Sequence, residues 1–207
     1  MKKIIVVFIV ILTAQFSFAQ ENTLLSSGIT SSGGFGGPVA KFTQLNDQSA
    51  FILGARGGWI VNHSFIIGGG MYGLVGNVSV DTKIGDIIYK DSDYLRFGYG
   101  GLELEYIFAP MSVVHVSVYT LLGVGGVSYR NYSENFNETG DNYNHHSMQN
   151  PVFVAEPAVN VEVNLTEFFR IDLGVSYRYV SQIDYQMINA ENLRGVSGIL
   201  TFKFGKF

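Results

Sequence analysis

The chain has 207 residues, a formal net charge of −4 and no cysteine. The absence of cysteine excludes disulfides, thiolate metal sites and cysteine nucleophiles. The mild negative charge gives no indication of nucleic-acid binding, since such domains carry clustered Lys and Arg. Twenty-five glycines and a 14% aromatic content beside few charged residues favour tightly packed β structure.

The start of the chain has the organisation of a secretory signal peptide. A basic beginning and an apolar run over residues 4–12 precede the small residue Ala19. An uncleaved membrane anchor is the alternative, but a helical span needs about 20 apolar residues and this run is shorter. We therefore predict a cleaved signal peptide over 1–19 and one exported domain over 20–207.

The rest of the chain contains segments in which polar and apolar residues alternate. These segments predict eight β-strands. The predicted strands are 36–44, 49–61, 65–76, 94–108, 113–130, 152–164, 168–180 and 194–207. Tight turns at 62–64, 109–112 and 165–167 alternate with long connections at 77–93, 131–151 and 181–193. Short turns on one side and long loops on the other are typical of an up-and-down transmembrane barrel. The first connection, at Asn46 and Asp47, is short although it lies on the long-loop side.

The segment 168–180 shows the alternation most clearly. One face carries aromatic and branched residues, whereas the other carries Arg170, Asp172 and Arg178. In a soluble sandwich the apolar face would form the core, but in a transmembrane barrel the assignment reverses and the apolar face contacts lipid.

Aromatic residues favour the barrel, because they gather at strand ends, where a membrane has its interfaces. A sandwich core would place them in the middle of the strands. The predicted girdle residues are Trp59, Phe65, Tyr106, Phe108, Tyr129, Phe169, Tyr177, Tyr179, Phe204 and Phe207.

The segment 94–108 keeps its alternation only if a β-bulge lies at Gly100 and Gly101, where glycine permits the required backbone. With that bulge Arg96 faces the interior together with Glu103 and Glu105. The predicted outward set of this strand is then Leu95, Phe97, Tyr99, Leu102, Leu104 and Tyr106.

Charged residues of the opposite parity are predicted to fill the barrel interior. Eight strands enclose a space just wide enough for side chains, so these groups must mostly neutralise one another. The predicted lumen charge network is Arg56, Arg96, Glu103, Glu105, Glu156, Glu162, Arg170, Asp172, Arg178 and Lys203, with Lys41 as a less certain member. A salt-bridged plug is the main interpretation, and a narrow gated pore or proton path is the alternative.

Two histidine motifs are candidates for chemistry. His115 and Ser117 share a strand face and resemble the catalytic segment of outer-membrane lipid A deacylases. Their parity, however, predicts an interior, hydrogen-bonded histidine, and their place at the start of the segment 113–130, just after a tight turn, predicts the periplasmic side. His145 and His146 lie among acids in the longest loop, where their spacing matches no defined metal site. We predict no catalytic, cofactor or metal residues.

The whole mature chain resembles an uncharacterised family of small Gram-negative outer-membrane β-barrel proteins, and more loosely the membrane domain of outer-membrane protein A. The stretches that carry the resemblance are 57–64, 98–106, 156–160, 174–180 and 202–207. The resemblance implies contact with outer-membrane lipid and lipopolysaccharide. It also implies that the barrel assembly machinery inserts the chain, since the terminal Phe207 is of the kind that this machinery recognises.

Together these features predict an all-β protein, a closed antiparallel eight-stranded barrel in the bacterial outer membrane with periplasmic termini. Its predicted role is structural or surface interaction, with binding through the long loops to a surface ligand that the sequence does not identify. The alternatives are a lipid-modifying enzyme and a narrow solute pore. A ten-stranded wall is a further alternative if residues 23–30 and 84–89 join it.

Overall fold

The computed structural model describes residues 31–84, 87–131, 150–181 and 189–207, and the predicted signal peptide lies outside them. The described chain forms nine strands and one short 3₁₀ helix, η2 (Ala190–Leu193). The strands are β1 (Ser32–Leu45), β2 (Gln48–Val61), β3 (Phe65–Val75), β4 (Ser79–Ile84), β5 (Ile87–Phe108), β6 (Val114–Asn131), β7 (Asn150–Asn164), β8 (Phe169–Val180) and β9 (Gly195–Lys206). Among these residues no helix is long and apolar enough to cross a membrane.

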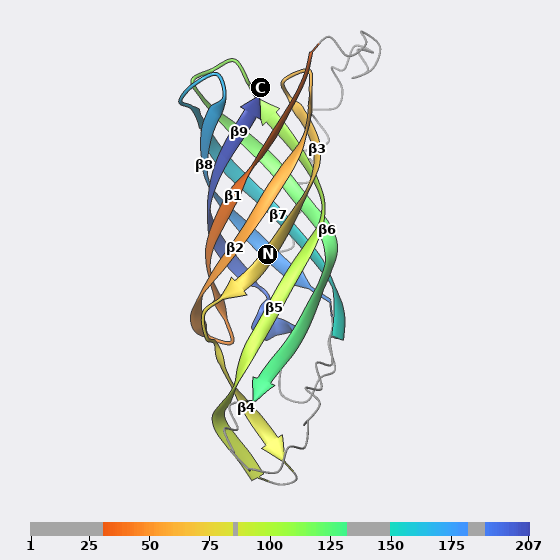
Figure 1. The fold of residues 1–207 in the computed structure, drawn as a ribbon, viewed down its shortest axis with the longest axis vertical. Helices are drawn as coiled ribbons and strands as arrows, with labels where there is room; N and C mark the ends of the chain where they lie inside the picture. The colour runs from red at the N-terminus through yellow and green to blue at the C-terminus, as the bar shows by residue number, and fades with distance from the viewer. Residues whose placement is uncertain (1–30, 85–86, 132–149, 182–188) are drawn as a thin grey trace, which may run out of the picture. The chain divides into compact units, whose positions relative to one another are not determined.

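Eight of the strands close into a barrel, as the alternating pattern predicts. The sheet order is β3-β2-β1-β9-β8-β7-β6-β5, every neighbouring pair is antiparallel, and β3 pairs with β5 to complete the ring (Figure 1). With β4 left aside, each wall strand pairs with the next wall strand in the sequence, and β1 pairs with β9. The topology is therefore up-and-down, and closure leaves no open edge in the wall.

The remaining strand, β4, lies in a segment that the sequence predicts as a long connection. It pairs only with β5, from Ser79 opposite Tyr94 to Ile84 opposite Ile87, with an irregularity between Val80 and Thr82. The predicted long loop at 77–93 is thus largely a β-hairpin that continues past the barrel wall (Figure 1). Because β4 does not enter the ring, the described residues of the segment 84–89 add no further strand to the wall, and residues 23–30 of the ten-stranded alternative lie outside the described part of the chain.

Positive backbone angles allow the two tightest turns. Asn46 and Asp47 join β1 to β2 with φ of 49° and 58°, and Asn62 and His63 follow β2 with φ of 51° and 60°. Two successive positive φ values match the right-handed twist of the flanking strands, and Asn and Asp accept them readily. The short first connection that interrupts the predicted alternation is therefore a two-residue hairpin turn.

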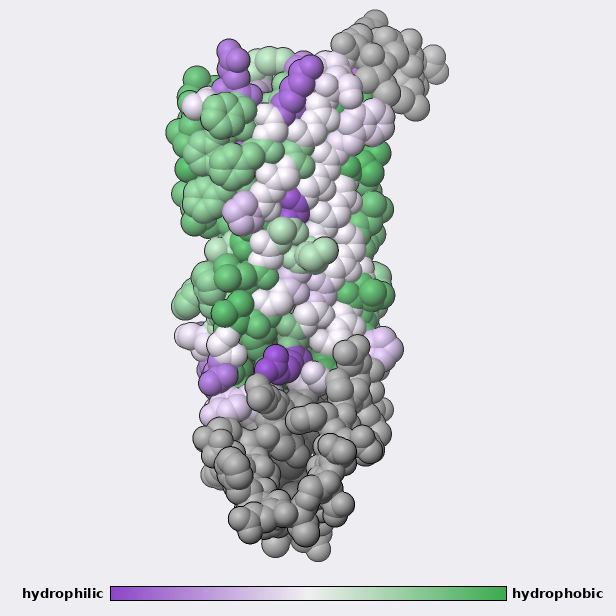
Figure 2. All heavy atoms as spheres, in the orientation of Figure 1, coloured by the Kyte–Doolittle hydropathy of each residue, from purple (hydrophilic) through white to green (hydrophobic). Residues whose placement is uncertain are grey.

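The wall is apolar outside and polar inside, the reverse of a soluble protein. Large apolar side chains are exposed along the strands, among them Phe42, Met71, Val124, Leu173 and Val175. Figure 2 shows apolar residues over much of the outer wall, with a paler band across the face in view. Gly36, Gly57 and Gly69 face outward as partners on β1, β2 and β3, so part of the outer wall carries no side chains.

Strand β5 corrects the predicted bulge. Its register with β3 and with β6 is continuous through Gly100 and Gly101. Leu95, Phe97 and Tyr99 are therefore buried inside the barrel, and Arg96 is exposed on the outer wall. The alternation pattern predicts these residues on the outer face, but their side chains fill the interior, where the Tyr99 ring stacks on the Tyr72 ring with 5.2 Å between ring centroids.

The close pairing of Gly101 with Gly123 makes the unbroken register possible. A β-carbon on Gly101 would overlap backbone atoms of Leu122 and Gly123 on β6. Replacing Gly101 by Val is therefore expected to lower the free energy of unfolding by about 1–3 kcal/mol, as overpacking does. Urea unfolding in detergent micelles, followed by the fluorescence of the single tryptophan, measures the change.

Gly126→Val is the matched control, because a β-carbon on this glycine would meet no atom within 4 Å. Equal unfolding midpoints for Gly101→Val and Gly126→Val would contradict the close-packing argument.

Candidate functional site: the ion-paired lumen and the outer wall

Charged side chains fill the barrel interior in equal numbers. Among the residues whose side chains the structure describes, five basic and five acidic residues are buried, and all ten come from wall strands. They are Lys41, Arg56, Arg170, Arg178 and Lys203 with Glu103, Glu105, Glu156, Glu162 and Asp172. The structure places nine of the ten predicted network residues here, together with Lys41, the less certain member. Arg96 faces outward because the predicted bulge is absent.

Lys203 on β9 is the hub at the turn-side half of the lumen. Its Nζ lies 2.9 Å from Glu105, 2.6 Å from Glu162 and 2.9 Å from Asp172. Arg170 donates a second hydrogen bond to Glu162 at 2.7 Å. The three carboxylates have the spacing of a metal-binding group, but the ammonium already contacts all of them, and Arg56 and Arg170 also pair with Glu105 and Glu162.

Arg56 on β2 joins this hub to the middle of the lumen. Its Nε donates to Glu103 at 2.7 Å and its Nη2 donates to Glu105 at 2.9 Å. The guanidinium lies 4.2 Å from the centre of the Tyr119 ring, and Tyr72 donates its hydroxyl to Glu103 at 2.5 Å. Planar Arg suits this place because it bonds two carboxylates while stacking on an aromatic face.

Lys41 and Glu156 form the third pair, towards the long loops. The Lys41 ammonium lies 2.9 Å from Glu156 and 3.5 Å from the centre of the Tyr72 ring. Tyr99 and Ser176 donate their hydroxyls to the same carboxylate at 2.6 Å. The sequence does not predict Tyr72, Tyr99 and Ser176 as parts of the network. For Lys41 the sequence signal is the parity on β1, which it shares with the buried Val39 and Thr43.

The short helix η2 covers the lumen next to Arg178. Leu193 is fully buried, and its carbonyl accepts a hydrogen bond from Arg178 Nε at 2.8 Å. Asn192 accepts a backbone hydrogen bond from Asn46 at 2.8 Å and donates its side chain to Asn46 Oδ1 at 3.0 Å. The connection between β8 and β9 is thus fastened to the β1–β2 turn across the loop-side end.

His115 and Ser117 both face the interior, as their parity predicts. His115 Nε2 lies 2.9 Å from Glu162 Oε1 and its Nδ1 lies 3.1 Å from the Ser112 carbonyl. Ser117 is fully buried and accepts a hydrogen bond from Asn160 at 3.4 Å. Both ring nitrogens are occupied by other groups, so the geometry does not make a nucleophile and base from this pair. His145 and His146 lie outside the described residues.

Most predicted girdle residues face outward. Trp59, Tyr106, Phe108, Tyr177, Tyr179 and Phe204 are exposed on the wall, and Phe65 and Phe169 are half-buried there. Phe207 is the exception: it packs against the interior cluster of Phe35, Ile60, Ile66 and Ile107, 3.8 Å beneath the Arg170 guanidinium. The terminal aromatic closes the turn-side end of the lumen because its position continues the inward parity of Lys203. The side chain of Tyr129 is not among those that the structure describes.

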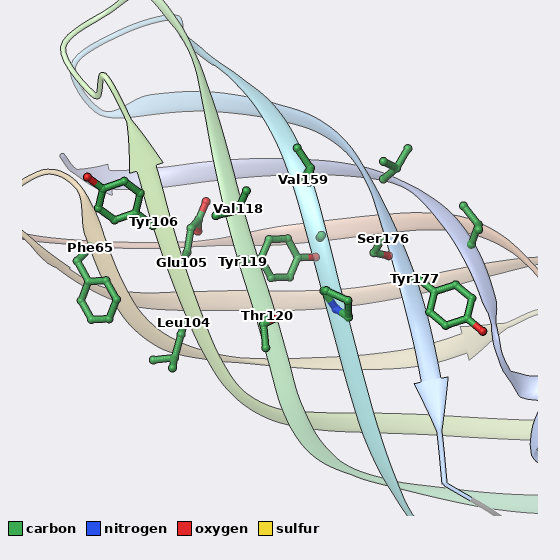
Figure 3. Close-up of a pocket in the computed structure, with 14 residues that line it drawn as sticks. Phe65, Leu104, Glu105, Tyr106, Val118, Tyr119, Thr120, Val159, Ser176 and Tyr177 are labelled. Atoms are coloured by element: carbon green, nitrogen blue, oxygen red, sulfur yellow. The ribbon is translucent and has the colours of Figure 1, made fainter. Parts of the chain in front are cut away.

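Two apolar grooves cross the outer wall. The larger, about 650 Å³, runs from Phe65 and Tyr106 at one end to Tyr177 at the other (Figure 3). The smaller, about 400 Å³, lies nearer the loop end and is lined by Met71, Gly98, Gly100, Val124, Gly126 and Pro151, among others. Both are hollows on the outer face of the wall, where small residues such as Thr120 or glycine interrupt larger ones.

No protein-family model matches the chain, and no curated protein matches it. Solved structures do share its fold. Neisserial surface protein A is 13% identical, covers 85% of this chain and 97% of its own length, and has a TM-score of 0.55. The N-terminal β-barrel domain of OprF from Pseudomonas aeruginosa is 11% identical, covers 84% and 96%, and has a TM-score of 0.53. The likeness shows a common barrel fold.

Removing the hub cation is expected to destabilise the barrel strongly. Lys203→Met leaves Glu105, Glu162 and Asp172 buried without their shared ammonium, which is expected to cost roughly 3–5 kcal/mol. Urea midpoints and the fraction of protein that migrates as the compact form on unheated gels measure the loss. Lys206→Met on the same strand is the control, since Lys206 is exposed. A Lys203→Met barrel as stable as the control would contradict the hub.

Proposed function

We propose that this chain is an outer-membrane barrel with a sealed, ion-paired lumen that acts as a structural or surface-interaction protein. The observation that carries the proposal is the inverted distribution of polarity: exposed Phe, Leu and Val outside, and ten buried charges inside. Exposed apolar surface of this extent is stable only against hydrocarbon. Closed barrels are also the β structures whose backbone polar groups are all satisfied within lipid.

The lumen supports a plug rather than a pore. Lys41, Arg56, Arg170 and Lys203 each contact a buried carboxylate, and Arg178 bonds the η2 backbone that covers one end. Phe207 packs into the other end. A conducting pore needs a continuous wet path lined by groups that release the ion, and paired charges with bulky aromatics oppose that.

A lipid-modifying enzyme is less well supported. Its reacting groups would have to lie on the wall near the outer leaflet, whereas His115 and Ser117 are buried and His115 is held by Glu162 and Ser112. Lipid A analysis of a deletion strain tests this alternative directly: altered acyl chains would favour the enzyme, and leakiness with normal lipid A would favour the structural role.

Surface recognition would come from the loop end of the barrel. The β4–β5 hairpin continues past the wall, and η2 is fixed to the β1–β2 turn. Segments held on a rigid frame are the usual carriers of recognition. The long connection 131–151 falls mostly outside the described residues, so its share in binding stays a prediction.

The proposed orientation puts the long loops outside the cell and the termini in the periplasm. Because the chain has no cysteine, single substitutions report accessibility cleanly. Glu191→Cys in η2 is expected to react with a membrane-impermeant maleimide in intact cells, whereas Glu167→Cys in the β7–β8 turn is expected to react only after the outer membrane is opened. Both residues are exposed. The opposite labelling pattern would reverse the orientation.

The sealed lumen predicts that the protein conducts no ions. Purified barrel inserted into planar bilayers is expected to give a flat current at voltages where an added porin gives discrete steps. Insertion is checked in parallel by protease protection in vesicles of the same composition. Reproducible single-channel steps would replace the plug by the narrow pore.

A further inference from the structure

The smaller groove on the outer wall lies where glycines expose the backbone of two neighbouring strands. Gly98 on β5 is the partner of Gly126 on β6, and Gly100 on β5 is the partner of Val124. Met71 from β3 and Pro151 from β7 form the sides. The result is an apolar hollow of about 400 Å³ on the face that contacts hydrocarbon.

An exposed arginine stands at the loop-side end of this groove. Arg96 is on the same strand face as Gly98, two residues or about 7 Å further along β5. It forms no hydrogen bond or ion pair with any residue that the structure describes. Its cross-strand partner on β6 is Ser128, also at the outer surface. A guanidinium on a lipid-facing wall is costly within hydrocarbon, so its position indicates the level of the lipid headgroups.

We propose that Arg96 and this groove bind a phosphate-bearing lipid of the outer leaflet, lipid A, with a phosphate at the guanidinium and an acyl chain along Gly98, Gly100 and Gly126. The proposal rests on the outer-membrane location and orientation proposed above, which put the loop end at the outer leaflet. Arginine binds phosphate oxygens through paired hydrogen bonds, and its free donors match a doubly charged headgroup. The apolar hollow directly below matches the attached hydrocarbon.

A second copy of the chain fits this surface less well. A two-fold interface places the same patch of both copies face to face, which would bring the two Arg96 side chains together within the membrane. Like charges so placed repel, and no acidic side chain lies among the residues that line the groove. Charge complementarity therefore favours an anionic lipid.

The test compares lipid retention by four single variants with that of the full-length protein. Arg96→Gln removes the headgroup contact, and Gly126→Leu fills the groove without a backbone clash, since a β-carbon there meets no atom within 4 Å. Lys206→Gln removes an exposed charge at the opposite end of the wall. Gly36→Leu adds the same bulk to β1 at a glycine that is equally open.

Native mass spectrometry of the purified barrels, titrated with diphosphoryl lipid A, dephosphorylated lipid A or phosphatidylglycerol, measures binding. We expect Arg96→Gln and Gly126→Leu each to lower lipid A affinity about tenfold, a change of about 1.4 kcal/mol. The two control variants are expected to bind lipid A with the affinity of the unsubstituted chain. The unsubstituted chain is expected to bind dephosphorylated lipid A about as weakly as the Arg96→Gln variant binds lipid A.

Unchanged lipid A affinity in Arg96→Gln, or equal binding of dephosphorylated lipid A, would overturn the headgroup contact. Unchanged affinity in Gly126→Leu would overturn the acyl groove, and equally tight, Arg96-dependent binding of phosphatidylglycerol would overturn the choice of lipid A. Outer-membrane fractionation and heat-modifiable migration of the same samples report on the proposed function separately. A correctly inserted barrel that binds no lipid A would overturn this inference alone.

Discussion

Charge neutralisation inside the barrel is the constraint on which the rest of the structure depends. The ring of eight strands leaves little room for water, so each buried charge needs a partner among the neighbouring side chains or backbone groups. Lys203 contacts three carboxylates from three other strands, and Arg56 bonds one of these carboxylates and also Glu103. Because the partners come from distant parts of the sequence, the pairs fix strand register around the ring as well as filling the space.

The glycines follow from the same packing problem. Long side chains such as Arg56, Tyr72 and Tyr99 occupy the centre, so the strands beside them carry glycine where the backbones approach closely, as at Gly101 and Gly123. Outward glycines have the opposite effect, because they remove side chains from the lipid side and leave hollows. Glycine thus allows close backbone approach inside the barrel and leaves hollows on its outer wall. The groove next to Arg96 is one of these hollows.

A filled lumen places function at the ends and on the outer wall of the barrel. The turn-side end is occupied by Phe207 against Phe35, Ile60 and Ile66, and the loop-side end by η2 over Arg178. Within the described part of the chain, the surfaces that remain available to partners are the loop-side hairpin of β4 and β5, the outer wall and its grooves. Solved barrels of the same fold differ from this chain at almost nine positions in ten, so the fold does not identify a partner.

The sequence by itself determined the eight strands of the barrel wall, the tight turns between them and which faces of β6 to β9 point outward, because strict alternation leaves one arrangement that buries charges such as Glu162 and Asp172. Only the tertiary structure decided which way the side chains of β5 before Gly100 point. The reason is that the same aromatic residue types occur inside a lumen and on a lipid-facing wall. The hydroxyl of Tyr99 has its carboxylate partner on β7, 57 positions away, and no local pattern contains that pairing. For the same reason the sequence placed Arg96 inside, whereas the continuous hydrogen-bond register from β3 through β5 to β6 turns it outward.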